Sequence, residues 1–330
     1  MAKLAHVQKT PALLGQPLIQ SVQERLKKHL KGKEDIVEFA LATFLARGHL
    51  LLEGPPGTGK TSLAKGMASA FGGSFRRVQL TSDLLPSDIV GILRLKPGES
   101  EFEFRKGPVF THFLLADELN RTSPKTQSAL LEAMAEGTVT VDGKTHDLPR
   151  PFFVAATQNP LEFHGVYPFA ESQLDRFMMQ LSVNSPEKKD EIEIYQNYAN
   201  RTEKHGENDG SPKEEEPALI SIEQTMGLQE EACHVFVEET ILEYLTDLVR
   251  ATRYRPEISF GVSVRGGLQY IAAAKALAYV RGRDYVAPKD ITDLAAPVLA
   301  HRLCFSGGEP DNKQRHDVVR QILERVQPPR

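Results

Sequence analysis

Residues 54–61, Gly-Pro-Pro-Gly-Thr-Gly-Lys-Thr, have the types and spacing of a loop that binds phosphate groups. An apolar run at residues 49–53 precedes them, and residues 62–68 repeat small and apolar side chains with helical spacing. Glycines allow the backbone to curl so that several N–H groups point inward, where a Cβ would obstruct an anion. The following helix would add the positive end of its dipole. The pattern therefore predicts a strand, a phosphate-binding loop and a helix.

The side chains of this loop predict where a nucleotide and its metal ion would bind. Lys60 would reach the β- and γ-phosphates, and the Thr61 hydroxyl would ligate Mg²⁺. The alternative is a glycine-rich turn that only joins a strand to a helix, and it is disfavoured because every defined position of the motif is filled. We expect ATP to contact Gly54, Pro55, Pro56, Gly57, Thr58, Gly59, Lys60, Thr61 and Ser62.

Two acids, Asp117 and Glu118, end an apolar run at residues 113–116. Such a run predicts a buried parallel strand, and ligands of open α/β sheets bind at the carboxyl ends of the strands. Asp117 would hold Mg²⁺, directly or through water, and Glu118 would orient and deprotonate the attacking water. An Asp-Glu pair is ordinarily a solvated helix start, but its distance from the phosphate loop favours a role in ATP hydrolysis.

A second buried strand is expected at residues 152–157, and Gln158-Asn159-Pro160 follows it. An amide at Asn159 can hold the nucleophilic water between the γ-phosphate and Glu118. An asparagine that caps a turn before a proline is the alternative, and the residues alone do not choose between the two.

Composition sets outer bounds on the class of protein. A chain of 330 residues is long enough for two domains of unequal size. Its formal net charge of −4 gives no basic field of the kind that attracts nucleic acid. Cys233 and Cys304 match no metal or redox spacing, and no apolar run approaches the roughly 20 residues of a membrane span. We therefore expect a soluble, cytoplasmic protein in which nucleic acid is not the partner.

Two hairpins and a helical C-terminal part complete the expected organisation. Residues 91–105 alternate around a Pro-Gly turn, and residues 138–148 alternate around Asp142-Gly143, a strong hairpin signal. Helical periodicity returns in the C-terminal part of the chain. Residues 200–217 contain no hydrophobic residue, so a flexible polar insertion is expected there.

The chain resembles the AAA+ ATPases, and among them the MoxR family, over nearly its whole length. The resemblance is densest from residue 54 to residue 177. Beside the phosphate loop, the similar strings are Leu84-Leu-Pro-Ser-Asp-Ile89, Lys106-Gly-Pro-Val-Phe110, Ala116-Asp-Glu-Leu-Asn-Arg121, Thr157-Gln-Asn-Pro160 and Leu174-Asp-Arg-Phe177. The two hairpins resemble the helix-2 insert and the pre-sensor-1 insert of the clade that also contains magnesium chelatase and minichromosome maintenance helicases.

This resemblance implies an α/β P-loop NTPase fold in two parts. Residues 1–184 would form the AAA+ nucleotide-binding core, a three-layer sandwich with a central parallel sheet and the two hairpin insertions. Residues 185–330 would form a smaller all-α lid domain. Asn159 would be sensor 1, and Arg176 the arginine finger offered to the nucleotide of the neighbouring subunit.

Four further residues follow from the resemblance or stay open beside it. Arg265 falls on the sensor 2 arginine, although Val264 and Gly266 depart from the usual Gly-Ala-Ser-Pro-Arg-Ala pattern, and the choice between a role in its own subunit and one in the neighbour stays open. Arg121 either contacts a phosphate of the neighbouring subunit or pairs with a local carboxylate. Phe102 and Phe104 either dock a client or seat the first hairpin on the core.

The resemblance also implies a function. Proteins of this family usually form homo-oligomeric rings, commonly hexamers, bind ATP and Mg²⁺, and remodel or mature a protein client, often with a partner that has a von Willebrand factor A domain. One alternative is a nucleic-acid motor of the same clade, which the slightly acidic charge disfavours. Another is a nucleotide-gated scaffold without hydrolysis, which the intact set of Lys60, Asp117, Glu118 and Asn159 disfavours.

Overall fold

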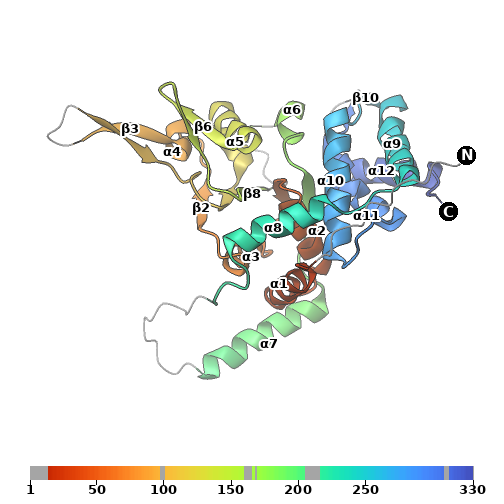
Figure 1. The fold of residues 1–330 in the computed structure, drawn as a ribbon, viewed down its shortest axis with the longest axis horizontal. Helices are drawn as coiled ribbons and strands as arrows, with labels where there is room; N and C mark the ends of the chain where they lie inside the picture. The colour runs from red at the N-terminus through yellow and green to blue at the C-terminus, as the bar shows by residue number, and fades with distance from the viewer. Residues whose placement is uncertain are drawn as a thin grey trace, which may run out of the picture.

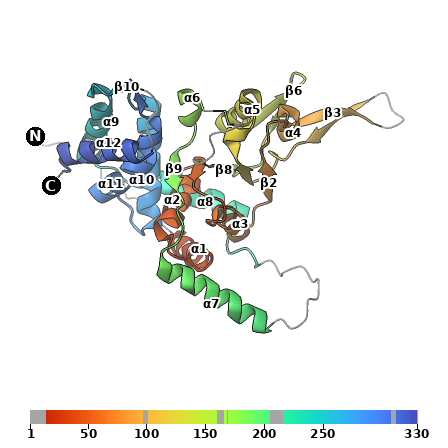
Figure 2. The ribbon, with the colours of Figure 1, turned by 180° about the vertical axis from the view of Figure 1, so that it is seen from behind.

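The computed structural model describes residues 14–96, 101–159, 166–167, 169–204, 216–307 and 312–329. A central sheet with helices on both sides forms the middle of the molecule, a hairpin projects at one end of the long axis, and a group of helices lies at the other end (Figure 1). Seen from behind, the hairpin lies on the right and the group of helices on the left, and one long helix, α7 (Lys188–Lys204), lies along the lower edge (Figure 2).

The central sheet has five parallel strands in the order β2-β5-β8-β1-β9. Its strands are β1 (Leu50–Glu53), β2 (Phe75–Gln79), β5 (Phe113–Asp117), β8 (Phe153–Gln158) and β9 (Met179–Ser182). Strands β1 and β5 are buried along their whole length, as expected of a parallel sheet covered on both faces. The parallel sheet expected from the apolar runs is therefore confirmed.

Successive residues of each strand point to opposite faces, so the sheet separates two apolar cores. Leu50 and Leu52 belong to one core, in which the ring of Phe44 lies 4.9 Å from that of Phe113. Leu51 and its neighbours on the other face belong to the second core. The first helices of the chain are α1 (Gln16–His29), α2 (Glu34–Leu45), α3 (Lys60–Ala70), α4 (Pro86–Val90) and α5 (Pro124–Glu136).

Both expected hairpins are present. The first consists of β3 (Gly91–Leu95) and β4 (Phe102–Lys106), and its Pro-Gly turn lies outside the described residues. The second consists of β6 (Thr138–Val141) and β7 (Lys144–Asp147), joined by Asp142 and Gly143 with φ of 47° and 75°.

The hairpins contact each other through Phe104. Its ring stacks on His146 of the second hairpin at 4.1 Å and lies 5.5 Å from the ring of Phe110. Phe102 is 67% exposed. Phe104 therefore seats the first hairpin on the core, and Phe102 does not.

The C-terminal part is mostly helical. The lid was expected to be all-helical, but it also contains a short antiparallel ribbon, in which β10 (Ile258–Phe260) pairs with β11 (Cys304–Phe305). Its remaining elements are α8 (Ile222–Cys233), α9 (Glu239–Ala251), η2 (Thr252–Tyr254), α10 (Val264–Val280), α11 (Pro288–Leu299), η3 (Ala300–Arg302) and α12 (Asn312–Arg325). Helix α7 continues to Lys204, five residues into the segment 200–217 that was expected to be a flexible insertion, and residues 205–215 lie outside the described residues. The helix continues because the first glycine of that segment comes only at residue 206.

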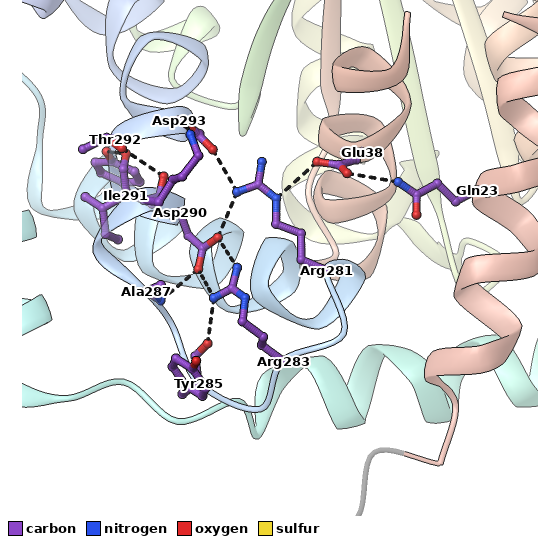
Figure 3. Close-up of polar contacts among 12 residues, drawn as sticks. Gln23, Glu38, Arg281, Arg283, Tyr285, Ala287, Asp290, Ile291, Thr292 and Asp293 are labelled. Carbon is purple, nitrogen blue, oxygen red and sulfur yellow. Dashed lines mark hydrogen bonds and ion pairs between the residues drawn. The ribbon is translucent and has the colours of Figure 1, made fainter.

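An ion-pair cluster ties the C-terminal helices to α2 (Figure 3). Asp290 at the start of α11 is fully buried and accepts hydrogen bonds from Arg281 at 3.0 Å and from Arg283 at 2.6 Å. Arg281 also pairs with Glu38 of α2 at 3.2 Å and with Asp293 at 2.8 Å. Because each buried charge has an opposite partner, the cluster fixes the end of α10 against the N-terminal helices.

A second tie joins the C-terminal helices to the segment before β9. Buried Arg302 donates to Asp175 at 2.8 Å and to the carbonyl of Phe177 at 2.7 Å, and His301 contacts the same carbonyl at 3.1 Å. These residues lie beside Arg176.

Among the described residues, no helix is long and apolar enough to cross a membrane.

Candidate nucleotide-binding and catalytic site

A cleft of about 300 Å³ lies at the carboxyl ends of the sheet strands and collects the candidate residues from distant parts of the chain. The phosphate loop, Asp117 and Glu118 all line this cleft. Asn159 follows β8 and also lines the cleft. Of the nine loop residues expected to contact nucleotide, all but Pro55 line the cleft.

The backbone of the phosphate loop requires glycine at two positions for different reasons. Gly54 has a φ of 150°, and a Cβ there would lie 2.2 Å from the carbonyl oxygen of Val183. Gly57 has open space around it, but its φ of 80° is one that other residues rarely adopt. Helix α3 starts directly after the loop, and its N-cap, Gly59, has no side chain to occupy the first N–H groups. The loop and the helix start are therefore suited to bind an anion.

Lys60 holds the loop in its present shape. Its ammonium donates to the carbonyl oxygens of Gly54 at 2.8 Å and Pro55 at 2.7 Å. Burial lowers the pKa of Lys60, while Asp117 and Glu118 act in the opposite direction. The Lys60 ammonium is therefore close enough to interact electrostatically with Asp117 and Glu118. It lies against the carbonyl oxygens of the phosphate loop.

Thr157 of β8 fixes both acids. Its hydroxyl donates to Asp117 Oδ1 at 2.7 Å and accepts from the backbone N–H of Glu118 at 2.9 Å. Thr157 is 2% exposed, so these hydrogen bonds form away from water and have few competitors. One buried hydroxyl therefore sets the orientation of the carboxylate of Asp117 and the backbone of Glu118.

Glu118 has a backbone conformation that is unusual for its residue type. Its φ is 58°, in the left-handed region, which costs energy for a residue other than glycine. Its carboxylate lies 3.2 Å from Arg121, and its side chain is 30% exposed. Of the two alternatives for Arg121, the structure shows the local ion pair. Glu118 therefore lines the cleft from a strained turn at the end of β5.

The donor atoms in the cleft fit a nucleotide with Mg²⁺. Thr61 offers a hydroxyl and Asp117 a carboxylate, which are hard oxygen ligands of the kind that Mg²⁺ prefers. Magnesium commonly takes only one or two protein ligands and completes its shell with phosphates and water. Among the described residues, no cluster of three or more histidines, cysteines and acids suited to a metal occurs.

The two arginines expected to contact nucleotide lie outside this cleft. Arg176 is half-buried and donates to the carbonyl oxygen of Leu131 at 2.9 Å. Arg265 is exposed in the first turn of α10, where Ser263 caps the helix by accepting from Gly266 at 3.0 Å. Arg265 lies near buried Arg302. Burial lowers the pKa of Arg302, and the charge of Arg265 lowers it further. The chain therefore brings together the loop, both acids and Asn159, but not the two arginines.

Two residues that hydrogen-bond to Asp117 in the cleft were not expected to have a role at the site. Thr157 and Arg77 both hydrogen-bond to Asp117, from strands on either side of β5. A polar residue within an apolar strand is a signal that could have drawn attention to Thr157. Arg77 is one of two adjacent arginines in β2, and nothing in that stretch of sequence indicates a role at the site.

Comparisons with known proteins agree with this geometry. Residues 49–179 match the family model of the "ATPase family associated with various cellular activities (AAA)", and residues 250–322 match the AAA lid domain. The chain is 43% identical to YeaC, an uncharacterized protein of Bacillus subtilis, over 95% of both chains. It is 39% identical to chaperone MoxR1 of Mycobacterium tuberculosis over 91% of this chain and 80% of the relative.

A solved structure is similar over the whole fold. The crystal structure of a proposed ATPase from Cytophaga hutchinsonii superposes with a TM-score of 0.83 at 33% identity and covers 96% of both chains. Together with the phosphate loop and the two acids at the sheet edge, these similarities show that the chain belongs to the MoxR family of AAA+ ATPases.

Proposed function

We propose that this protein hydrolyses ATP to ADP and phosphate with Mg²⁺, and that it does so as a ring of identical subunits, commonly a hexamer in its family. The observation that carries the proposal is the buried Thr157 hydroxyl, which holds Asp117 and the backbone of Glu118 in the cleft that the phosphate loop also lines. A loop that binds phosphate and an oriented pair of acids are the parts that phosphoryl transfer to water requires.

Each residue of the cleft has a distinct task in this reaction. Lys60 exchanges its loop carbonyl partners for phosphate oxygens, and Thr61 and Asp117 hold the metal ion. Mg²⁺ supplies positive charge to the phosphates when it is bound. Asn159 holds the attacking water, and Glu118 accepts its proton. The Arg121 ion pair keeps the carboxylate of Glu118 in place until the water arrives.

The two remaining arginines act at the boundary between subunits. Arg176 completes the site of the neighbouring subunit, since a planar guanidinium can bind two phosphate oxygens and stays charged throughout. Arg265 at the start of α10 is the sensor of the lid. In this division, residues 1–184 form the nucleotide-binding core and residues 185–330 the lid, whose position the Arg302–Asp175 pair transmits to Arg176.

The energy of hydrolysis serves the remodelling or maturation of a protein client in the cytoplasm, together with partners that have a von Willebrand factor A domain. One of the similar proteins is named a chaperone. A net charge of −4 gives no general attraction for nucleic acid, which argues against a nucleic-acid motor.

Lys60→Ala tests the proposal at its first step. We expect ATP affinity to fall by roughly a hundredfold or more, because a charged hydrogen-bond donor to phosphate is lost. The thermal melt should change little, because the Lys60 side chain is only half-buried and belongs to neither apolar core. Lys65→Ala on the exposed side of α3 is the matched control. Equal ATP affinity in Lys60→Ala and the parent protein would refute the assignment.

A further inference from the structure

Arg77 is the cation closest to the acid that is expected to hold the metal ion. Arg77 and Gln79 point to the same face of β2, and Gln79 is in register with Asp117 of β5. The Arg77 side chain spans the two-residue offset of about 6.6 Å along the strand. Its Nε lies 2.8 Å and its Nη2 2.7 Å from the same oxygen, Asp117 Oδ2.

The two oxygens of Asp117 have different surroundings. Oδ1 accepts from the buried hydroxyl of Thr157, so it is fixed within the sheet. Oδ2 is covered by Arg77, whose side chain is 52% exposed, whereas that of Asp117 is only 11% exposed. The guanidinium thus reaches from the solvent side of the cleft to the one carboxylate oxygen that an incoming ligand could approach.

The charges that line the cleft are balanced. Lys60 and Arg77 are positive, and Asp117 and Glu118 are negative. A carboxylate that is largely removed from water requires a nearby opposite charge. Mg²⁺ at Oδ2 would lie within a few ångströms of the guanidinium, and two cations at that distance repel each other even when water screens them.

We propose that Arg77 is a built-in counter-ion of Asp117, which competes with Mg²⁺ for Oδ2 and moves aside when the metal ion binds with ATP. The proposal rests on the proposed function, in which Asp117 is a metal ligand. Arg77 can move because half of its side chain is already exposed and none of it belongs to either apolar core. The ion pair keeps Asp117 oriented in the absence of nucleotide, and it weakens binding of Mg²⁺ to the acid alone.

The test is the affinity for the metal ion itself. Mn²⁺, which can be followed by electron paramagnetic resonance, is titrated into full-length protein saturated with a non-hydrolysable ATP analogue. Arg77→Gln retains a polar side chain without the charge and should bind Mn²⁺ roughly tenfold more tightly, because the competing charged hydrogen bonds are gone. Arg77→Lys keeps the positive charge but loses the planar guanidinium with its several N–H donors, and it should give an intermediate affinity. Arg76→Gln changes the neighbour whose side chain points to the opposite face of β2, and should leave the affinity unchanged.

The outcomes separate this inference from the proposed function. Weaker or unchanged Mn²⁺ binding in Arg77→Gln would overturn the competition, and weaker binding would make Arg77 a positioning residue for the metal ligand. Asp117→Asn should weaken Mn²⁺ binding in the otherwise unchanged protein. If Asp117→Asn has no effect, the metal ion is not held by Asp117 and the proposed function fails at that point. Thermal melts without metal establish that each variant is folded.

Discussion

The acid side of the cleft and the arginines around it differ in what holds them. Asp117 is fixed by Thr157 and Arg77, and Glu118 by Thr157 and Arg121, all within one chain. Arg176 donates to a carbonyl of α5, Arg265 is exposed at the start of α10, and neither residue lines the cleft. The difference supports the proposal that one chain binds ATP and positions the base, while a neighbouring subunit supplies the charge that completes the site.

The largest effect should come from Arg176→Ala. An arginine that stabilises the transferring phosphate from outside the site is worth roughly 10³–10⁵ in rate, so turnover should fall by that factor. ATP affinity should change little, because the loop and both acids are intact. Steady-state ATPase assays measure turnover, and a nucleotide titration measures ATP affinity. Light scattering with nucleotide shows whether the variant still assembles. Normal turnover in this variant would break the comparison and make Arg121 the next arginine to test.

Glu118→Gln sharpens the comparison from the acid side. The amide keeps the shape and loses the base, so single-turnover hydrolysis should slow by roughly 10²–10⁴-fold while ATP still binds. Single-turnover experiments with radiolabelled ATP give the rate of the chemical step. Unchanged hydrolysis would show that Glu118 is not the base, and lost ATP binding would indicate a structural or metal-binding role. Such a variant would also hold ATP and its client, which makes it suited to affinity capture.

Thr157→Val should have an intermediate effect. It removes the hydroxyl but keeps the volume, leaving Glu118 N–H and Asp117 Oδ1 without their buried partner. Each unsatisfied buried group costs about 1–3 kcal/mol, so kcat/KM for Mg·ATP should fall roughly ten- to a hundredfold. Thr157→Ser restores the hydroxyl and should recover most of the loss. If valine and serine variants behave alike, the hydroxyl does not position the acids.

The smallest effect concerns the other end of the sheet, where His49 ties β1 to its neighbours. Its Nδ1 accepts from the backbone N–H of Val154 at 3.1 Å, and its Nε2–H donates to the carbonyl of Met134 at 3.0 Å. Burial lowers the pKa of His49 to about 4 from the usual 6.5. The folded state therefore keeps the ring neutral where the unfolded chain already binds a proton.

The stabilising contribution of neutral His49 is complete above pH 6.5 and is lost as the pH falls toward 4. From pH 7 to pH 5, the free energy of unfolding should drop by about 2 kcal/mol on account of this residue. Urea unfolding of the parent and of His49→Gln at both pH values isolates the contribution, since other buried histidines titrate in both proteins. An equal pH dependence in the two would contradict it.

Local patterns in the sequence predicted the parts of the site that lie next to one another in the chain. The phosphate loop and the Asp117-Glu118 pair each occupy one short stretch, and Asp142-Gly143 marks its hairpin because both residues adopt positive φ. Arg77 and the role of Thr157 were missed because they depend on the strand order β2-β5-β8, and no local pattern shows which distant strands are neighbours.

The surroundings of the two arginines were not predictable for a related reason. Nothing near Arg176 in the sequence indicates that α5 supplies its hydrogen-bond acceptor, 45 residues away. The ribbon between β10 and β11 likewise joins residues far apart in the chain, so the periodicity of the helices concealed it. Residues that function through packing of distant elements require the structure.

Mixing two inactive variants tests the shared site most directly. Arg176→Ala retains Lys60, and Lys60→Ala retains Arg176, so an interface formed from the two in the right order is complete. If the subunits mix at random in equal amounts, about a quarter of the interfaces are complete, and about a quarter of the parent ATPase activity should return. Lys60→Ala mixed with the doubly substituted chain forms no complete interface and is the control. Recovery well above that control is the result we predict, whereas mixed rings that form, as judged by light scattering, and stay inactive would contradict a site shared between subunits.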